Sequence, residues 1–178
     1  MRTFNTTGLC VPNKHYMVDI SERLEQMKGM VEEGTYFTIH RGRQYGKTTT
    51  LKMLEKYLKD EYVVISLDFQ AISSAGFQTE TSYVQALSRI LIRKNREIGI
   101  PDFVMRQLRE YVNRKENTIS LDELFFTFTD WCMDSDKPIL LFIDEVDSAT
   151  NNGIFLDFLA LLRYHYLERE ASDNYKTF

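Results

Sequence analysis

Nine residues in the first third of the sequence have the types and order of a loop that binds phosphate. They run from Arg41 to Thr49 with the sequence Arg-Gly-Arg-Gln-Tyr-Gly-Lys-Thr-Thr. Backbone N–H groups at the start of a helix converge on anionic oxygens, and a glycine such as Gly46 lets the main chain approach them closely. Lys47 would place its charge on the β- and γ-phosphates, and the Thr48 hydroxyl would ligate Mg²⁺.

The match to the usual phosphate-loop pattern, GxxxxGK[ST], is incomplete. The first glycine of the pattern falls on Arg41, and Gly42 comes one residue late. A strand-to-helix turn that contains Gly-Lys-Thr by chance is the alternative interpretation. The residues expected to hold the phosphates are Gly42, Arg43, Gln44, Tyr45, Gly46, Lys47, Thr48 and Thr49.

Two acidic residues follow one of the longest apolar runs of the chain. The run Ile139–Ile143 leads directly into Asp144 and Glu145, an arrangement typical of the companion Mg²⁺ site in phosphate-loop proteins. Asp144 would hold the ion, and Glu145 would polarise the attacking water as a general base. The alternative is a buried strand that ends in solvated acids.

Strands and helices must position these residues, and the hydrophobic pattern predicts an alternation of the two. Short apolar runs predict strands at 36–40, 62–69 and 139–143. Helical spacing of apolar residues predicts helices at 20–31, 48–59, 82–97, 102–114, 120–132 and 154–169. Two pairs with capping-box spacing, Asp19 with Glu22 and Ser120 with Glu123, are expected to begin helices. This order predicts an α/β domain with a mainly parallel sheet.

Length and composition limit the classes of protein that fit. A chain of 178 residues has the length of one domain, here 1–178, with a leader at 1–18 and a helical segment between strands at 79–135. Its 22 Lys and Arg against 26 Asp and Glu give a net charge of −4, which disfavours nucleic-acid binding through overall charge but leaves room for a local basic patch. The basic residues within 89–96 are interpreted as a solvated helix face.

The cysteines and the apolar runs indicate a cytoplasmic protein without a membrane partner. Cys10 and Cys132 lie far apart and form no CxxC pair, so neither a disulfide framework nor a zinc site is predicted. The longest apolar run is far too short to span a bilayer.

With both motifs considered together, the chain resembles a phosphate-loop ATPase of the AAA-like type. A glutamate directly after the strand aspartate is similar to the branch of that superfamily with an additional strand and a catalytic glutamate. The loop resembles that of uncharacterised bacterial AAA-like ATPases, Arg-x-Arg-x-aromatic-Gly-Lys-Thr, in which the displaced first glycine is a family variant. The positions that match are Arg41, Arg43, Tyr45, Gly46, Lys47 and Thr48.

The resemblance implies a three-layer phosphate-loop NTPase domain that uses ATP and Mg²⁺, with adenine contacts near Tyr16–Asp19. It also implies a later strand, with a polar sensor residue, between the phosphate-loop strand and the acidic strand. We therefore expect these 178 residues to be the N-terminal portion of a longer ATPase, truncated before the sensor strand, or to close the sheet in another way. A protein partner or a homo-oligomer would then involve the missing C-terminal region.

These motifs predict Mg²⁺-dependent ATP hydrolysis coupled to a conformational change, with Glu145 and Lys47 as the catalytic residues. ATP is favoured over GTP because the sequence contains no Asn-Lys-x-Asp signature. The alternative is an ATP-binding switch or docking module with little turnover. A small-molecule kinase is a third hypothesis, weakened by the absence of an arginine-rich lid. Whether nucleic acid is a partner stays open.

Overall fold

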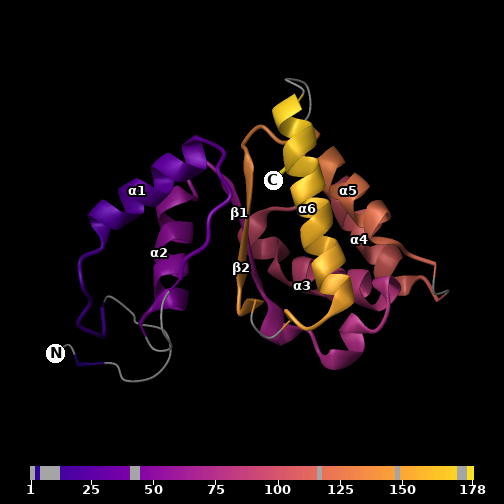
Figure 1. The fold of residues 1–178 in the computed structure, drawn as a ribbon, viewed down its shortest axis with the longest axis horizontal. Helices are drawn as coiled ribbons and strands as arrows, with labels where there is room; N and C mark the ends of the chain where they lie inside the picture. Colours follow the sequence, from indigo (N-terminus) through magenta and orange to yellow (C-terminus); the bar gives the residue numbers. More distant parts are fainter. Residues whose placement is uncertain (1–2, 5–12, 41–44, 116–117, 147–148, 172–175) are drawn as a thin grey trace. The chain divides into compact units, whose positions relative to one another are not determined.

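The computed structural model describes residues 3–4, 13–40, 45–115, 118–146, 149–171 and 176–178, and it divides into two compact units (Figure 1). The first unit is Met1–Glu61 and the second is Tyr62–Phe178. None of the helices in the described part combines the length and the apolar character that a membrane span requires.

The first unit is built on two helices, α1 (Ser21–Glu32) and α2 (Lys47–Leu58), which pack against each other. Each helix buries residues at helical spacing, Leu24 and Met27 on α1 and Thr50, Leu54 and Leu58 on α2. Polar contacts join the unit further: Lys28 Nζ lies 2.6 Å from Glu61 Oε1, and the Tyr57 hydroxyl donates to the Glu25 carboxylate.

The predicted strand at 36–40 is wrong. Residues 36–40 form irregular chain, in which Thr38 Oγ1 lies 2.8 Å from His40 Nε2. A strand exists only where its main chain pairs with a neighbour. The sheet of the described residues contains two strands, and 36–40 is not one of them.

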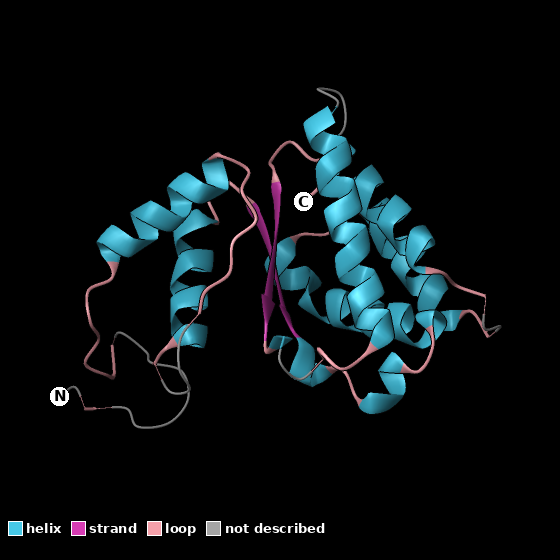
Figure 2. Cartoon of the chain, in the orientation of Figure 1, coloured by secondary structure: helices cyan, strands magenta, loops and turns pink. Residues whose placement is uncertain are grey.

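The second unit contains those two strands, β1 (Val63–Asp68) and β2 (Ile139–Asp144) (Figure 2). They pair in parallel, with Val63 opposite Ile139 and Asp68 opposite Asp144. Alternate side chains of both strands contribute to the core, among them Ile65, Leu67, Ile139, Leu141 and Ile143. The predicted combination of helices with parallel strands is therefore confirmed.

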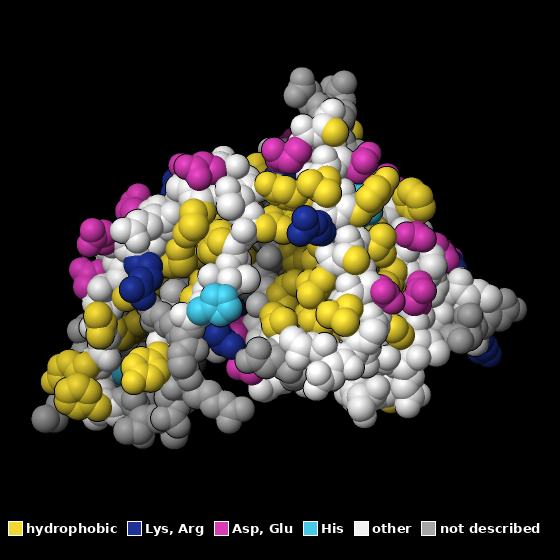
Figure 3. All heavy atoms as spheres, viewed as in Figure 1, with side chains coloured by type: hydrophobic (Ala, Val, Ile, Leu, Met, Phe, Trp, Pro, Cys, Tyr) yellow, Lys and Arg dark blue, Asp and Glu magenta, His cyan; other side chains and the backbone are white. Residues whose placement is uncertain are grey.

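Four helices of this unit lie on one side of the strands (Figure 1). They are α3 (Glu80–Ile98), α4 (Asp102–Asn113), α5 (Leu121–Asp134) and α6 (Gly153–Ala171), and short 3₁₀ helices η1 (Phe69–Ala71) and η2 (Ser74–Phe77) precede them. An aromatic cluster fills the space between strands and helices, with Phe69 and Phe155 rings 4.9 Å apart and Tyr83 and Phe158 rings 5.6 Å apart. Apolar side chains of α6 also reach the surface, including Leu156, Tyr164 and Leu167. Figure 3 shows apolar side chains exposed among the polar ones on one face of the protein.

Polar contacts join the beginnings of α3 and α5. Thr81 Oγ1 donates to the Ile119 carbonyl at 3.0 Å and accepts the Ile119 N–H at 2.9 Å. The N–H of Leu121 donates to Glu80 Oε2 at 2.7 Å. Each helix also begins with a capping box, so both N-termini have side-chain acceptors for their first N–H groups.

Candidate functional site

The residue that precedes α2 has a left-handed backbone conformation. Gly46 is the N-cap residue, with φ 73° and ψ 28°, and its carbonyl accepts the N–H of Thr50 at 2.8 Å. This left-handed conformation is strained for any residue with a Cβ, which explains why glycine occupies the position. The turn therefore directs the chain from the loop into the helix at Lys47.

Of the other loop residues, the structure describes Tyr45 and Lys47–Thr49. Tyr45 is exposed, Lys47 and Thr49 are half-buried and Thr48 is exposed. Since Lys47, Thr48 and Thr49 form the first turn of α2, they lie at the positive end of the helix dipole, where anions are stabilised. The remaining predicted residues, Gly42, Arg43 and Gln44, lie outside the described residues, as does Arg41.

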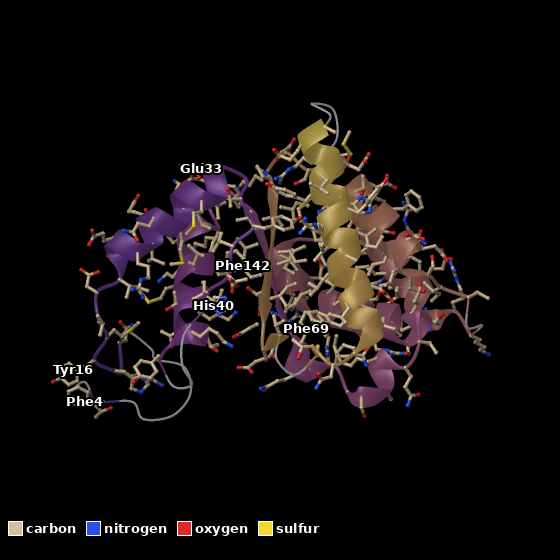
Figure 4. The ribbon with its side chains drawn as sticks, viewed as in Figure 1. Phe4, Tyr16, Glu33, His40, Phe69 and Phe142 are labelled. Atoms are coloured by element: carbon tan, nitrogen blue, oxygen red, sulfur yellow. The ribbon has the colours of Figure 1, made fainter. Side chains whose placement is uncertain are left out.

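An exposed aromatic pair lies in the leader of the same unit. Thr3 and His15 form an isolated parallel bridge, which places the ring of Phe4 4.9 Å from that of Tyr16, with an angle of 33° between the planes (Figure 4). Both side chains are exposed, Phe4 at 83% and Tyr16 at 54%. Exposed aromatic faces of this kind can stack on a base. Tyr16 was predicted as a base contact, whereas Phe4 was missed because it belongs to no periodic segment.

The acidic residues lie where the two parallel strands end. Asp144 closes β2 and stands opposite Asp68, which closes β1. Asp68 Oδ1 accepts the N–H of Gln70 at 2.9 Å and thereby caps η1. Asp144 Oδ1 accepts the N–H of the next residue, Glu145, at 2.9 Å. Sequence reasoning missed Asp68, although it too follows an apolar run.

Glu145 has an unusual backbone conformation. Its φ of 57° makes it the single residue other than glycine with a positive φ in the described part of the chain. Non-glycine residues in this region are uncommon and concentrate at functional sites, where the surrounding structure maintains the strain. The side chains of Asp144 and Glu145 are half-buried, so water can reach them.

The chemistry of these oxygen donors fits magnesium. Within the described ranges, no group of three His, Cys, Asp or Glu residues gathers as a set of metal ligands. Mg²⁺ is usually bound by one or two carboxylates together with phosphate oxygens and water, and does not need an all-protein cage. The Asp144 carboxylate is a donor of the type that such an ion takes.

A family model described as an AAA-like domain matches residues 11–178. The chain belongs to the AAA-like domain family. No curated protein and no solved structure matches it. The matched residues of this AAA-like domain include the loop around Gly46 and the acids at 144 and 145.

In this AAA-like domain the two predicted halves of the site belong to different units. Tyr45–Thr49 lie in the first unit, and Asp144 and Glu145 lie in the second. The first unit places a left-handed glycine before α2, and the second places an acid at the end of the parallel strand β2.

Proposed function

We propose that this AAA-like domain binds Mg²⁺ and ATP and hydrolyses the nucleotide, with the reaction coupled to a conformational change. The observation that carries the proposal is the left-handed Gly46 at the start of α2, followed directly by Lys47 and Thr48. A glycine in this conformation lets the chain pass close to phosphate oxygens at the N-terminus of a helix. Membership in the AAA-like family supports the same conclusion. We further propose that the complete fold is that of a three-layer phosphate-loop NTPase.

The loop residues would bind the triphosphate. Main-chain N–H groups from the segment Gly42–Thr49 would contact the phosphate oxygens, and Lys47 would neutralise charge on the β- and γ-phosphates. Thr48 and Asp144 would hold Mg²⁺, which supplies further positive charge at the β- and γ-oxygens when bound. Charge that is placed in advance where negative charge develops lowers the barrier without reorganisation.

Glu145 would activate the nucleophile. Its carboxylate would accept a hydrogen bond from a water molecule and orient the water oxygen toward the γ-phosphorus. As the new P–O bond forms, the bond from phosphorus to the β,γ-bridging oxygen breaks, ADP departs and the proton passes to Glu145. The unusual φ of Glu145 supports this assignment, because backbone strain at a strand end is a feature of catalytic positions.

The leader would contact the adenine. The exposed pair Phe4 and Tyr16 offers an aromatic surface for stacking, within the same unit as the loop around Gly46. Stacking does not distinguish adenine from guanine, so the preference for ATP rests on the absence of a guanine signature from the sequence.

Ligand-dependent stability, measured with phosphate release, tests this function. Mg²⁺–ATP at a hundredfold excess over its dissociation constant should stabilise the fold by about 2.7 kcal/mol. Lys47→Ala should abolish that shift. Lys56→Ala changes an exposed lysine nine residues further along α2 and should keep the shift. Glu145→Gln should keep the shift and lose phosphate release. Equal shifts in both lysine variants would refute the phosphate loop, and parent-rate hydrolysis by Glu145→Gln would refute the general base.

The same assay separates hydrolysis from the alternative, an ATP-binding switch with little turnover. A switch would show the full Mg²⁺–ATP shift, its loss in Lys47→Ala and no phosphate release from the parent protein. Release of phosphate without an added acceptor would exclude the kinase hypothesis.

A further inference from the structure

Positive charge concentrates on one pair of helices in this acidic protein. The segment 80–115, which contains α3 and α4, carries eight Lys and Arg against four Asp and Glu. The rest of the chain carries 14 Lys and Arg against 22 Asp and Glu. The overall charge of −4 therefore conceals a basic region with a net charge of the opposite sign.

Five arginines of this pair form what we call the arginine surface: Arg89, Arg93 and Arg96 on α3, and Arg106 and Arg109 on α4. All five are exposed. The spacing on α3 is i, i+4, i+7 and that on α4 is i, i+3, so each set follows one stripe of its helix. The stripe from Arg89 to Arg96 is roughly 10 Å long at about 1.5 Å per residue.

Within the described residues, the five arginines lack the ion pairs that several other cations form. Arg114, Lys28 and Lys52 each form an ion pair with a carboxylate at 2.6–2.8 Å. Within the described ranges, none of the five arginines forms an ion pair or a hydrogen bond. Unpaired guanidinium groups on adjacent helices repel one another, and a polyanion would relieve that repulsion.

The two helices that carry these arginines are joined by a short connection, hydrogen bonds and a shared core. Gly99, with φ 72°, ends α3, and Pro101 is the N-cap of α4, so the connection is short. The Gln85 amide of α3 donates to the carbonyls of Tyr111 and Arg114, at 3.1 and 2.9 Å. The opposite faces of both helices are buried in one core, which leaves the arginines on the outward sides of the pair.

The types of side chain on the arginine surface favour one class of polyanion over others. The described residues of α3 and α4 include no exposed large hydrophobic side chain, which an interfacial membrane helix would need. The same observation disfavours single-stranded nucleic acid, since its binding sites use exposed aromatic side chains for base stacking. Guanidinium groups match phosphate oxygens bidentately, and phosphate contacts of this kind carry no sequence preference.

We propose that the arginine surface of α3 and α4 binds the phosphate backbone of double-stranded nucleic acid without sequence preference. This revises the interpretation of 89–96 as a solvated helix face. The binding does not depend on nucleotide and is separate from the proposed ATPase site. With at most five phosphate contacts, the logarithm of the binding constant should fall with the logarithm of salt concentration with a slope no steeper than about −4.5.

Fluorescence anisotropy with labelled random-sequence duplexes of about 20 base pairs, one of DNA and one of RNA, tests the proposal between about 50 and 200 mM salt. The variant R89Q/R93Q/R96Q should weaken duplex binding at least tenfold at the lower salt concentration and reduce the salt slope by about 2.7. R106Q/R109Q, on the other helix, should reduce the slope by about 1.8. The control R23Q/K56Q/K59Q neutralises three exposed cations of α1, α2 and the residue after α2, and should bind within about twofold of the parent.

Three results would overturn the proposal. The parent protein could fail to bind either duplex at the lower salt concentration. The control could weaken binding as much as R89Q/R93Q/R96Q, which would show an effect of net charge alone. The parent could bind phosphatidylserine vesicles and not duplexes, which would assign the surface to a membrane. Circular dichroism of each variant checks that it is folded, and the two independent arginine sets keep the test decisive if one fails to fold.

Discussion

Asp144 accepts the backbone N–H of Glu145 through Oδ1 at 2.9 Å, at the position where Glu145 has a φ of 57°. The carboxylate proposed to hold Mg²⁺ therefore also fixes the main chain of the residue proposed to activate water. Side-chain chemistry and backbone strain at position 145 can be separated by two substitutions.

Glu145→Gly should relieve the strain and remove the base. Glycine adopts a positive φ without steric cost but is also freer in the unfolded chain, so we expect the free energy of unfolding to rise by about 0.5–1 kcal/mol. Glu145→Gln should leave that free energy unchanged, and both variants should lose ATP hydrolysis. Urea unfolding and phosphate release measure the two effects. A lower free energy of unfolding for Glu145→Gly would contradict the left-handed conformation.

Gly46→Ala should lower stability and weaken nucleotide binding, whereas Gly29→Ala should stabilise the protein. A Cβ at position 46 is strained by the φ of 73°, with a cost of about 1–2 kcal/mol, and nucleotide binding should weaken in parallel. Gly29 lies inside α1, where a Cβ would meet no atom within 4 Å, so alanine should gain up to about 1 kcal/mol from helix propensity. Thermal unfolding with and without Mg²⁺–ATP compares the pair. A nucleotide shift in Gly46→Ala equal to that of Gly29→Ala would count against the phosphate loop.

Loss of the hydroxyl should affect the free energy of unfolding differently at two buried tyrosines. The Tyr111 hydroxyl contacts the Glu123 carbonyl at 2.9 Å and Thr127 Oγ1 at 2.8 Å, so Tyr111→Phe should cost about 1 kcal/mol. The Tyr83 hydroxyl is buried with no hydrogen-bond partner among the described residues, and burial raises the pKa of the phenol. Tyr83→Phe should therefore be neutral or stabilise the fold by about 1 kcal/mol. Denaturant unfolding measures the free energy of unfolding of both variants. A larger decrease for Tyr83→Phe than for Tyr111→Phe would show that the Tyr83 hydroxyl has a partner in solution.

Acidification should lower the stability of the second unit because His165 becomes protonated. Its ring stacks on Phe125 at 4.9 Å with an angle of 5° between the planes. Burial lowers the pKa of His165 below 6.5, although the charges of Asp122 and Glu168 oppose this in part. The unfolded chain then binds the proton more readily than the folded one, so stability is complete above pH 6.5 and falls as the pH drops toward the folded pKa.

The comparison of melting temperatures at about pH 7.5 and about pH 5.5 measures this effect, because most carboxylates titrate at lower pH. His165→Gln should show a smaller difference between the two pH values than the parent protein. The same difference in both proteins would assign the acid sensitivity to other groups.

Local features that depend on side chains close in sequence were predicted well. Ser120 and Glu123 form the expected capping box at the start of α5, since both partners and the helix that they cap are adjacent in the chain. The same spacing at Asp19 and Glu22 gave a wrong prediction. Asp19 Oδ1 instead accepts the N–H and the hydroxyl of Ser21, at 2.9 and 2.6 Å, and Ile20 is the N-cap.

Features that depend on distant partners were predicted less well. The apolar run at 139–143 forms β2 because β1 pairs with it along its full length, whereas 36–40 has a similar β-prone composition and forms no strand. Propensity states which segments fit a sheet, and pairing decides which of them form one. Phe4 belongs to no periodic segment, and its contact with Tyr16 also depends on the bridge between Thr3 and His15.

The contacts of Thr81 and Glu80 with Ile119 and Leu121 have a consequence for how the second unit opens. The amides of Ile119 and Leu121 precede or begin α5, yet both donate to side chains of α3. Their deuterium uptake should therefore be governed by the separation of the two helices, and not by fraying of the end of one helix. These two amides would then report, position by position, the moment at which the α3–α5 interface comes apart.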